Sequence, residues 1–166
     1  EFKVETIYMD DGNFYVGDVD DVEKFVSFNP LAHEKAYLIK GEFFKLKRNK
    51  LVKFFKPDVA FLCCHGGEGE NGILQGLLEY NGIAYTSCDV CASACCMDKA
   101  FSKKIFDGLM LNVLPYETVL KSDYKKDGQG TVDRLKAVLD YPIIVKPSTG
   151  GSSIGIAVAT DDESLA

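Results

Sequence analysis

Alternating apolar and polar residues predict short strands in the first third of the chain. Residues 2–9 (FKVETIYM) alternate as a half-buried strand does, and the turn-forming residues 10–13 lead into a second extended piece at residues 14–16. Residues 35–55 carry lysines between apolar residues on both sides of Lys40-Gly41. This pattern favours a hairpin with solvated lysines, and a basic helix lying on a membrane surface is the alternative.

A strand, a glycine-rich loop, a helix and a second strand are predicted next. Residues 59–64 (VAFLCC) form a continuous apolar run, which is typical of a strand buried on both faces of a parallel sheet. After the loop at residues 65–72 (HGGEGENG), isoleucine and leucine recur at helical spacing as far as Asn81-Gly82, and residues 84–86 form a short strand. This order is one βαβ unit, in which ligands bind at the carboxyl ends of the strands.

The fold class that these elements predict is α/β, with two domains. The first, residues 1–110, is expected to be an open, mainly parallel sheet flanked by helices, and its last helix starts after Ser87 and runs to Phe106. The second, residues 111–166, is expected to be part of a separate α+β domain. Its expected elements are a strand (113–120), a polar loop (121–130), an amphipathic helix (132–139), an antiparallel hairpin (143–146 with 154–159) and the start of a helix (161–166).

Composition and charge narrow the function classes. The chain has 166 residues, 46% of them apolar, which indicates a folded domain and not a disordered segment. Its formal net charge of −6 makes it a poor general polyanion binder, so no nucleic-acid partner is expected and any phosphate site must be local. No membrane partner is expected either, because the longest apolar run is far shorter than the roughly 20 residues that span a bilayer. The first residues are charged, no initiator Met is present, and the acidic end resembles an interrupted helix, so both ends are expected to be cuts within a longer protein.

Six cysteines raise the question of disulfides or a metal site. Four of them are adjacent in pairs, Cys63-Cys64 and Cys95-Cys96, and adjacent cysteines bridge each other poorly because the ring that they would close is strained. A zinc site would need Cys88 and Cys91 to converge with the second pair, but these four thiols crowd into nine residues at the start of a predicted helix. We therefore expect small buried thiols, no metal ligands and a cytoplasmic location.

The loop at residues 149–155 has the composition of a phosphate-binding loop. Its glycines permit consecutive backbone N–H groups to turn toward one anion, and Ser152 and Ser153 add hydroxyl donors. Lys146, at the end of the preceding strand, can place a point charge on the same phosphates. The alternative is a mobile hairpin turn with a solvated lysine.

The earlier loop, at residues 65–72, carries two carboxylates and a histidine and therefore suits a small zwitterion better than a phosphate. Glu68 or Glu70 can pair with an ammonium group, and His65 can donate a hydrogen bond to a carboxylate. The alternative is a tight turn in which the backbone satisfies His65, and Glu70 caps the following helix. Lys99, in the last predicted helix of the first domain, is not singled out by spacing alone, because a lone helical lysine is usually solvated.

Taken together, these motifs resemble the D-alanine–D-alanine ligases of the ATP-grasp superfamily. The motifs that carry the resemblance occur in this order: HGGEGENGILQGLLE (65–79), GIAYT (82–86), ASA (92–94), MDK (97–99), KP (146–147) and GSSIG (151–155). The resemblance implies a subunit of about twice this length, with a Rossmann-like, pre-ATP-grasp N-terminal domain followed by a central ATP-grasp domain. It also implies ATP- and magnesium-dependent joining of two D-alanines through an acyl phosphate, for peptidoglycan synthesis.

The resemblance implies a nucleotide site in the second half of the chain. Lys99 and Lys146 are similar to the two lysines that contact ATP phosphates and neutralise charge during phosphoryl transfer. Gly150 and Gly151 belong to the flexible flap over the phosphates, and Ser153 is similar to a phosphate donor. The magnesium ligands are expected outside this chain.

The resemblance also implies a D-alanine site. Ser152 is similar to the catalytic serine that orients the acceptor substrate, and His65, with Glu70 as its neighbouring acid, is similar to the histidine of the D-alanine pocket. Two positions depart from the family pattern, Asn71 where Asp is usual and Ala84 where Pro is common.

Several family elements are expected to lie beyond this chain, so residues 1–166 alone are expected to be catalytically silent and at most a weak phosphate binder. The alternatives are a D-alanine–D-serine or D-alanine–D-lactate ligase, another ATP-grasp carboxylate–amine ligase, and a non-catalytic nucleotide-binding paralogue. A homodimer is the expected assembly of the family.

Overall fold

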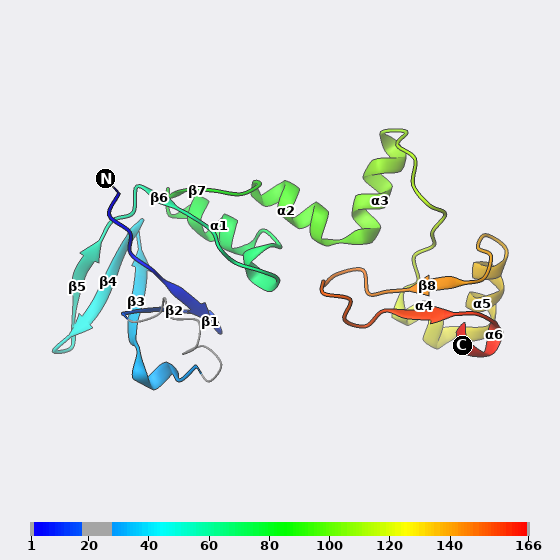
Figure 1. The fold of residues 1–166 in the computed structure, drawn as a ribbon, viewed down its shortest axis with the longest axis horizontal. Coiled ribbons are helices and arrows are strands. Elements are labelled where there is room, and N and C mark those ends of the chain that lie inside the picture. Colours follow the sequence, from blue (N-terminus) through cyan, green and yellow to red (C-terminus); the bar gives the residue numbers. More distant parts are fainter. Residues whose placement is uncertain (1, 18–27, 166) are drawn as a thin grey trace. The chain divides into compact units, whose positions relative to one another are not determined.

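A computed structural model describes residues 2–17 and 28–165 of the chain (Figure 1). The chain divides into two compact units, one formed by Glu1–Leu62 and Gly76–Ser87 and the other by Cys63–Gln75 and Cys88–Ala166. In the part of the chain that the structure describes, no helix is both long enough and apolar enough to cross a membrane.

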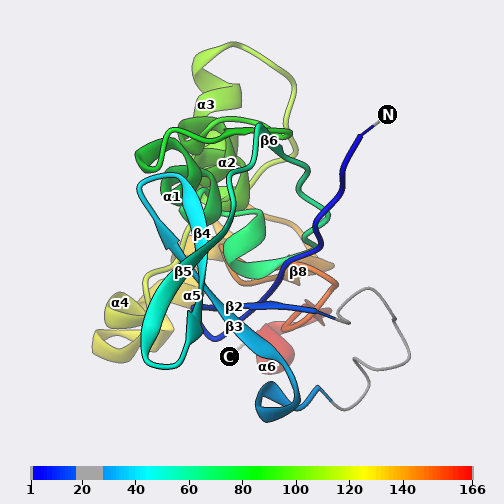
Figure 2. The same cartoon turned by 90° about the vertical axis from the view of Figure 1, so that its left-hand side faces the viewer.

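The first unit contains a five-stranded antiparallel sheet whose strands pair in sequence order (Figure 2). Left-handed residues at its tight turns, including Gly12 and Gly41, suit the primed turns that join such strands. The sheet's core is formed by Val16, Ala36 and Phe43, which are buried. The strands are β1 (Tyr8–Asp10), β2 (Asn13–Val16), β3 (Glu34–Ile39), β4 (Glu42–Lys47) and β5 (Lys50–Phe55).

The predicted hairpin at residues 35–55 is confirmed, and a third strand, β5, extends it. The membrane-surface helix considered for this segment is therefore wrong. The first predicted strand is shorter than expected, because only Tyr8 and Met9 of residues 2–9 pair with β2. The largest sheet of the described chain is thus antiparallel, in contrast to the mainly parallel sheet that was expected.

The parallel part of the first unit is small. Strand β6 (Val59–Ala60) pairs in parallel with β7 (Ala84–Tyr85), and the connection between them contains helix α1 (Ile73–Tyr80). The order of the βαβ unit is therefore confirmed, but residues 59–64 do not form one strand buried on both faces. Val59 is 56% exposed and Phe61 76% exposed, because the only described strand that pairs with β6 is β7.

In the second unit, the segment from Cys88 onward starts with two helices where one was predicted. Helix α2 (Val90–Met97) and helix α3 (Lys99–Gly108) are separated by Asp98, whose ψ of 109° is extended. The carboxylate of Asp98 accepts hydrogen bonds from the N–H groups of Ala100 and Phe101, at 2.9 and 3.2 Å, and so caps α3. The helix break is explained by this cap.

The segment between α3 and the last strands also differs from prediction. Residues 113–120 form no strand, and the predicted polar loop contains helix α4 (Lys121–Lys126). Side-chain contacts hold the extended segment in place of a ladder: the Tyr116 hydroxyl donates to Asp107 at 2.6 Å, and Arg134 donates to Glu117 at 2.8 Å. The first of these bonds, followed by burial, raises the pKa of Tyr116.

The end of the second unit follows the prediction closely. Helix α5 (Gly128–Lys136) starts earlier than predicted, because Asp127 caps it. The antiparallel hairpin is confirmed by β8 (Ile143–Val145) and β9 (Ala157–Ala159), and the C-terminal helix by α6 (Asp162–Leu165).

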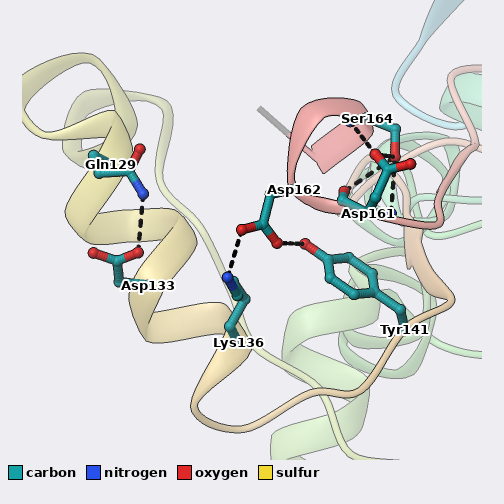
Figure 3. Close-up of polar contacts among 7 residues, drawn as sticks. All are labelled: Gln129, Asp133, Lys136, Tyr141, Asp161, Asp162 and Ser164. Atoms are coloured by element: carbon teal, nitrogen blue, oxygen red, sulfur yellow. Dashed lines mark hydrogen bonds and ion pairs between the residues drawn. The ribbon is translucent and has the colours of Figure 1, made fainter.

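Asp162 joins α6 to α5 (Figure 3). Its carboxylate accepts hydrogen bonds from the Lys136 amine at 2.5 Å and the Tyr141 hydroxyl at 2.8 Å. These bonds lower the pKa of Asp162. Burial, followed by the bond to Asp162, raises the pKa of Tyr141 to about 12.

The six cysteines are all free thiols, as expected, but they are not the buried thiols that were predicted. Five are exposed and Cys95 is half-buried. Partial burial, followed by a hydrogen bond with Cys91 on the same face of α2, raises the pKa of Cys95.

Candidate functional site

The loop at residues 65–72 leads into α1 and carries the first group of predicted site residues. His65 Nδ1 lies 3.6 Å from Glu70 Oε1, and the His65 side chain is 91% exposed. The two predicted D-alanine-binding residues therefore face each other at the surface. The helix begins with a hydrogen bond from the N–H of Ile73 to the Asn71 side chain at 3.0 Å, so Asn71 takes the capping position that the alternative interpretation gave to Glu70.

The base of this loop is buried and closely packed. Gly69 is buried, and a Cβ added to it would lie 2.1 Å from Cys64 Cβ. The Gly69 carbonyl accepts a hydrogen bond of 2.9 Å from Gln75 Nε2, and Gln75 is fully buried. Burial, followed by the nearby Cys63 and Glu70, raises the pKa of Cys64, so that thiol stays protonated at neutral pH.

The second group of site residues gathers where α3 meets the glycine–serine loop. The Lys99 amine donates to the Gly150 carbonyl at 2.7 Å and to the Ser148 carbonyl at 3.4 Å. The Lys99 backbone N–H also donates to the Ser148 carbonyl, at 2.8 Å. A lysine that spacing alone did not single out therefore contacts the predicted flap, fifty residues later in the chain.

The tip of the glycine–serine loop has a strained backbone. Ser152 and Ser153 both adopt left-handed φ values, 51° and 58°, between Gly150 at 97° and Gly155 at 74°. Left-handed backbone costs an ordinary residue roughly 1–2 kcal/mol. Such strain is found preferentially at ligand-binding loops, where it turns backbone N–H groups toward one point.

Lys146 lies one residue after β8, at the start of the same loop, and its side chain is exposed. Gly151, like the rest of the loop, is exposed, so the backbone donors are accessible to a ligand. Among residues 2–17 and 28–165, no group of three or more His, Cys, Asp or Glu side chains fits a metal ion. The described residues therefore include no such group that could hold magnesium.

Two contributors to the site were missed by sequence reasoning. Asp98 accepts a hydrogen bond of 2.5 Å from the Ser148 hydroxyl, and this bond, followed by those from α3, lowers the pKa of Asp98. Gln75 holds the earlier loop. The capping signal before Ala100 was present in the sequence, but the partner in the distant loop was not readable from spacing.

Two family models match most of this chain. The family model described as "D-ala D-ala ligase N-terminus" matches residues 1–88, and "D-ala D-ala ligase C-terminus" matches residues 105–166. The D-alanine–D-alanine ligase of Caldicellulosiruptor bescii is 37% identical over 155 residues, which are 91% of this chain and 42% of that relative. The one from Geobacter sulfurreducens is 43% identical over 108 residues, 65% of this chain and 32% of the relative. The chain spans less than half the length of both relatives.

Solved structures agree in fold. The D-alanine–D-alanine ligase of Helicobacter pylori matches with a TM-score of 0.81 at 25% identity, over 96% of this chain and 47% of that one. The VanG D-Ala:D-Ser ligase of Enterococcus faecalis matches with a TM-score of 0.71 at 27% identity, over 93% of this chain and 44% of that one. The α/β fold class is thereby confirmed. Because the family models cover both ends of the chain and the fold is shared, this chain belongs to the D-alanine–D-alanine ligase family.

Proposed function

We propose that the full-length protein is an ATP-dependent ligase that joins two D-alanines, through an acyl phosphate, into D-alanyl-D-alanine for peptidoglycan synthesis. The observation that carries this proposal is the contact between Lys99 and the glycine–serine loop, at 2.7 Å from amine to Gly150 carbonyl. A cation and a strained, donor-rich loop at one point form an arrangement suited to the phosphates of a nucleotide. ATP supplies the phosphoryl group that activates one D-alanine carboxylate.

In this proposal the residues of this chain bind the nucleotide phosphates and orient the acceptor amine. Lys99 and Lys146 neutralise phosphate charge that grows during transfer, and backbone N–H groups with the Ser153 hydroxyl donate to phosphate oxygens. Ser152, at the strained tip, orients the acceptor amine. Together with Gly150 and Gly151, these residues form the nucleotide-facing half of the site.

The first D-alanine is assigned to the loop at residues 65–72. His65 can donate a hydrogen bond to a carboxylate, and the Glu70 carboxylate, 3.6 Å from His65, can pair with an ammonium group. The exposure of both side chains leaves them accessible to a small zwitterion. This assignment accounts for a loop that carries both signs of charge.

The organisation of the whole protein is part of the same proposal. We propose an N-terminal domain, residues 1–110, and a central ATP-grasp domain, residues 111–166. Two separate family models, matching residues 1–88 and 105–166, support a division into two domains. A homodimer in the cytoplasm, with magnesium bound by residues beyond this chain, follows the family expectation.

A coupled phosphate-release assay tests the activity. Full-length protein with ATP is expected to release phosphate with D-alanine, and Lys99→Met is expected to lower kcat about 100-fold or more, the usual loss when a group that stabilises transition-state charge is removed. Lys104→Met, an exposed lysine in the same helix, is the matched control and should change little. The chain of residues 1–166 alone should release none.

Three results of this assay would contradict the proposal. Faster release with D-serine or D-lactate would assign a different acceptor, and the VanG structure makes D-serine the first to test. ATP binding without turnover on any substrate would indicate a non-catalytic nucleotide-binding paralogue. Equal losses in the two lysine variants would remove Lys99 from the site.

A further inference from the structure

The base of the glycine–serine loop is tied to the start of α3 by contacts that the ligase chemistry does not require. Asp98 Oδ1 accepts three hydrogen bonds, from the Ser148 hydroxyl and from two N–H groups of α3. The Ser148 carbonyl in turn accepts from the Lys99 N–H at 2.8 Å. Ser148 is therefore held through its side chain by Asp98, the N-cap of α3, and through its backbone by Lys99, the first residue of α3.

The tip of the loop is held in a different way. Gly150 accepts a bond of 2.7 Å from the Lys99 amine, and a flexible lysine side chain carries this contact. A neutral carbonyl is a weaker acceptor for an ammonium group than an anionic phosphate oxygen, because the phosphate adds the attraction between two opposite charges. The tip contact is thus the one that a phosphate would replace. The base is held mainly by the Ser148 hydroxyl and the Lys99 backbone N–H, and the Lys99 amine adds only a longer bond of 3.4 Å to the Ser148 carbonyl.

We propose that Asp98 and Ser148 form a clasp that fixes the base of the loop at α3, so that Lys99 stays beside the loop while its amine exchanges the Gly150 carbonyl for a nucleotide phosphate. Asp98 is a positioning residue in this account, and it does not touch the substrate. The exchange step rests on the proposed function; the clasp itself does not.

The charge of Asp98 fits this role. Three donors converge on the Asp98 oxygen and stabilise its negative charge. The low pKa of this carboxyl, caused first by the Ser148 hydroxyl, keeps it ionised at neutral pH. The clasp therefore persists over the whole physiological range.

Amide hydrogen exchange of Lys99 tests the clasp directly. Lys99 is the first residue of α3, where an N–H group has no partner within the helix, so protection of its amide reports docking of Ser148. In the full-length protein without ligand, Ser148→Ala should raise the exchange rate of this amide by about three- to tenfold, which corresponds to the usual free energy of one such hydrogen bond. Ser148→Thr, which keeps the hydroxyl, should restore protection.

Variants of two capping residues separate the effect of losing the clasp from the effect of losing a helix cap. Asp89 caps α2 through a bond of 2.8 Å from the Ala92 N–H, as Asp98 caps α3. Asp98→Ala should deprotect the Lys99 amide, and Asp89→Ala should leave it unchanged. An unchanged Lys99 amide in Ser148→Ala, or failure of the threonine variant to restore it, would overturn the clasp.

Kinetics of the full-length protein test the consequence. Ser148→Ala should raise KM for ATP several-fold with kcat within about twofold, and Ser148→Thr should reverse this, since the clasp fixes the base of the loop that binds ATP and does not itself contact the substrates. A fall in kcat with unchanged KM for ATP would overturn the positioning role. Absence of ATP turnover in the unsubstituted protein would refute the proposed function, while the exchange result would still decide the clasp.

Discussion

Gly69→Ala is expected to destabilise the protein through a single close contact at the base of the first site loop. The added Cβ would lie 2.1 Å from Cys64 Cβ and 3.0 Å from its Sγ. Because a Cβ cannot occupy this space, one of the two segments must shift, and overpacking of this kind costs about 1–3 kcal/mol. Such a shift would also weaken the 2.9 Å bond from Gln75 to the Gly69 carbonyl, worth about 1 kcal/mol. The expected loss is therefore about 2–4 kcal/mol.

A double-mutant cycle identifies the cause. Cys64→Gly removes the clashing atoms and leaves Cα at 3.5 Å, which is an ordinary contact. Alone it should cost about 0.5–1 kcal/mol in backbone entropy. The double variant, measured by urea unfolding, should therefore be more stable than Gly69→Ala alone.

Gly108→Ala is the matched control, because it has nothing within 4 Å of the added Cβ, and it should be neutral or slightly stabilising. Additive losses in the double-mutant cycle would refute the steric reasoning. So would a Gly69→Ala variant within about 0.5 kcal/mol of the parent, the range of ordinary surface changes.

Three further predictions concern stability, one of them a gain and two of them losses. Met110→Gly should stabilise the protein by about 1 kcal/mol in urea unfolding, because Met110 is exposed and follows the C-cap of α3 with a left-handed φ of 57°. A loss of stability would contradict this. Gly41→Ala should lower the free energy of unfolding by about 1–3 kcal/mol more than Gly12→Ala does. Both glycines have a left-handed φ, but only at Gly41 would an added Cβ lie 2.5 Å from the Asn81 carbonyl oxygen. Equal losses in the two variants would exclude this steric contact. Asp162→Asn should lower the free energy of unfolding at neutral pH. Bonds from a lysine amine and a tyrosine hydroxyl lower the pKa of Asp162 in the folded protein below 3.8, its ordinary value, so the difference from the parent should shrink as pH falls below about 3.8. A difference that persists at pH 2 would contradict this.

Local patterns predicted the elements that depend on local chemistry. Glycines at left-handed turns and alternation around Lys40-Gly41 were sufficient for the β3–β4 hairpin. The apolar stripe of α1 predicted its extent, since Leu74 and Leu78 are buried. In both cases the deciding interactions lie within a few residues of one another.

The predictions were wrong where contacts between side chains far apart in the sequence decide the local structure. Residues 113–120 were predicted to form a strand, but Tyr116 and Glu117 bind helix side chains and the segment pairs with no described strand. The predicted long helix breaks at Asp98, because its carboxylate caps α3 and also binds Ser148, fifty residues away. Such a tertiary contact outweighs helix propensity and cannot be read from spacing.

The site residues divide in the same way. His65 and Glu70 lie in one loop, and their proximity was readable from the sequence. The meeting of Lys99 with Gly150 was implied only by the family resemblance, and the structure places the two in contact. The roles assigned to these residues stay predictions.

The structure of the full-length protein with a nonhydrolysable ATP analogue tests the central claim most directly. The account predicts that the Lys99 and Lys146 amines both lie within about 3 Å of oxygens of the same triphosphate, with Ser148 still bound to Asp98 beneath the loop. A bound analogue whose phosphates leave either amine in solvent, or lie away from the glycine–serine loop, would contradict it.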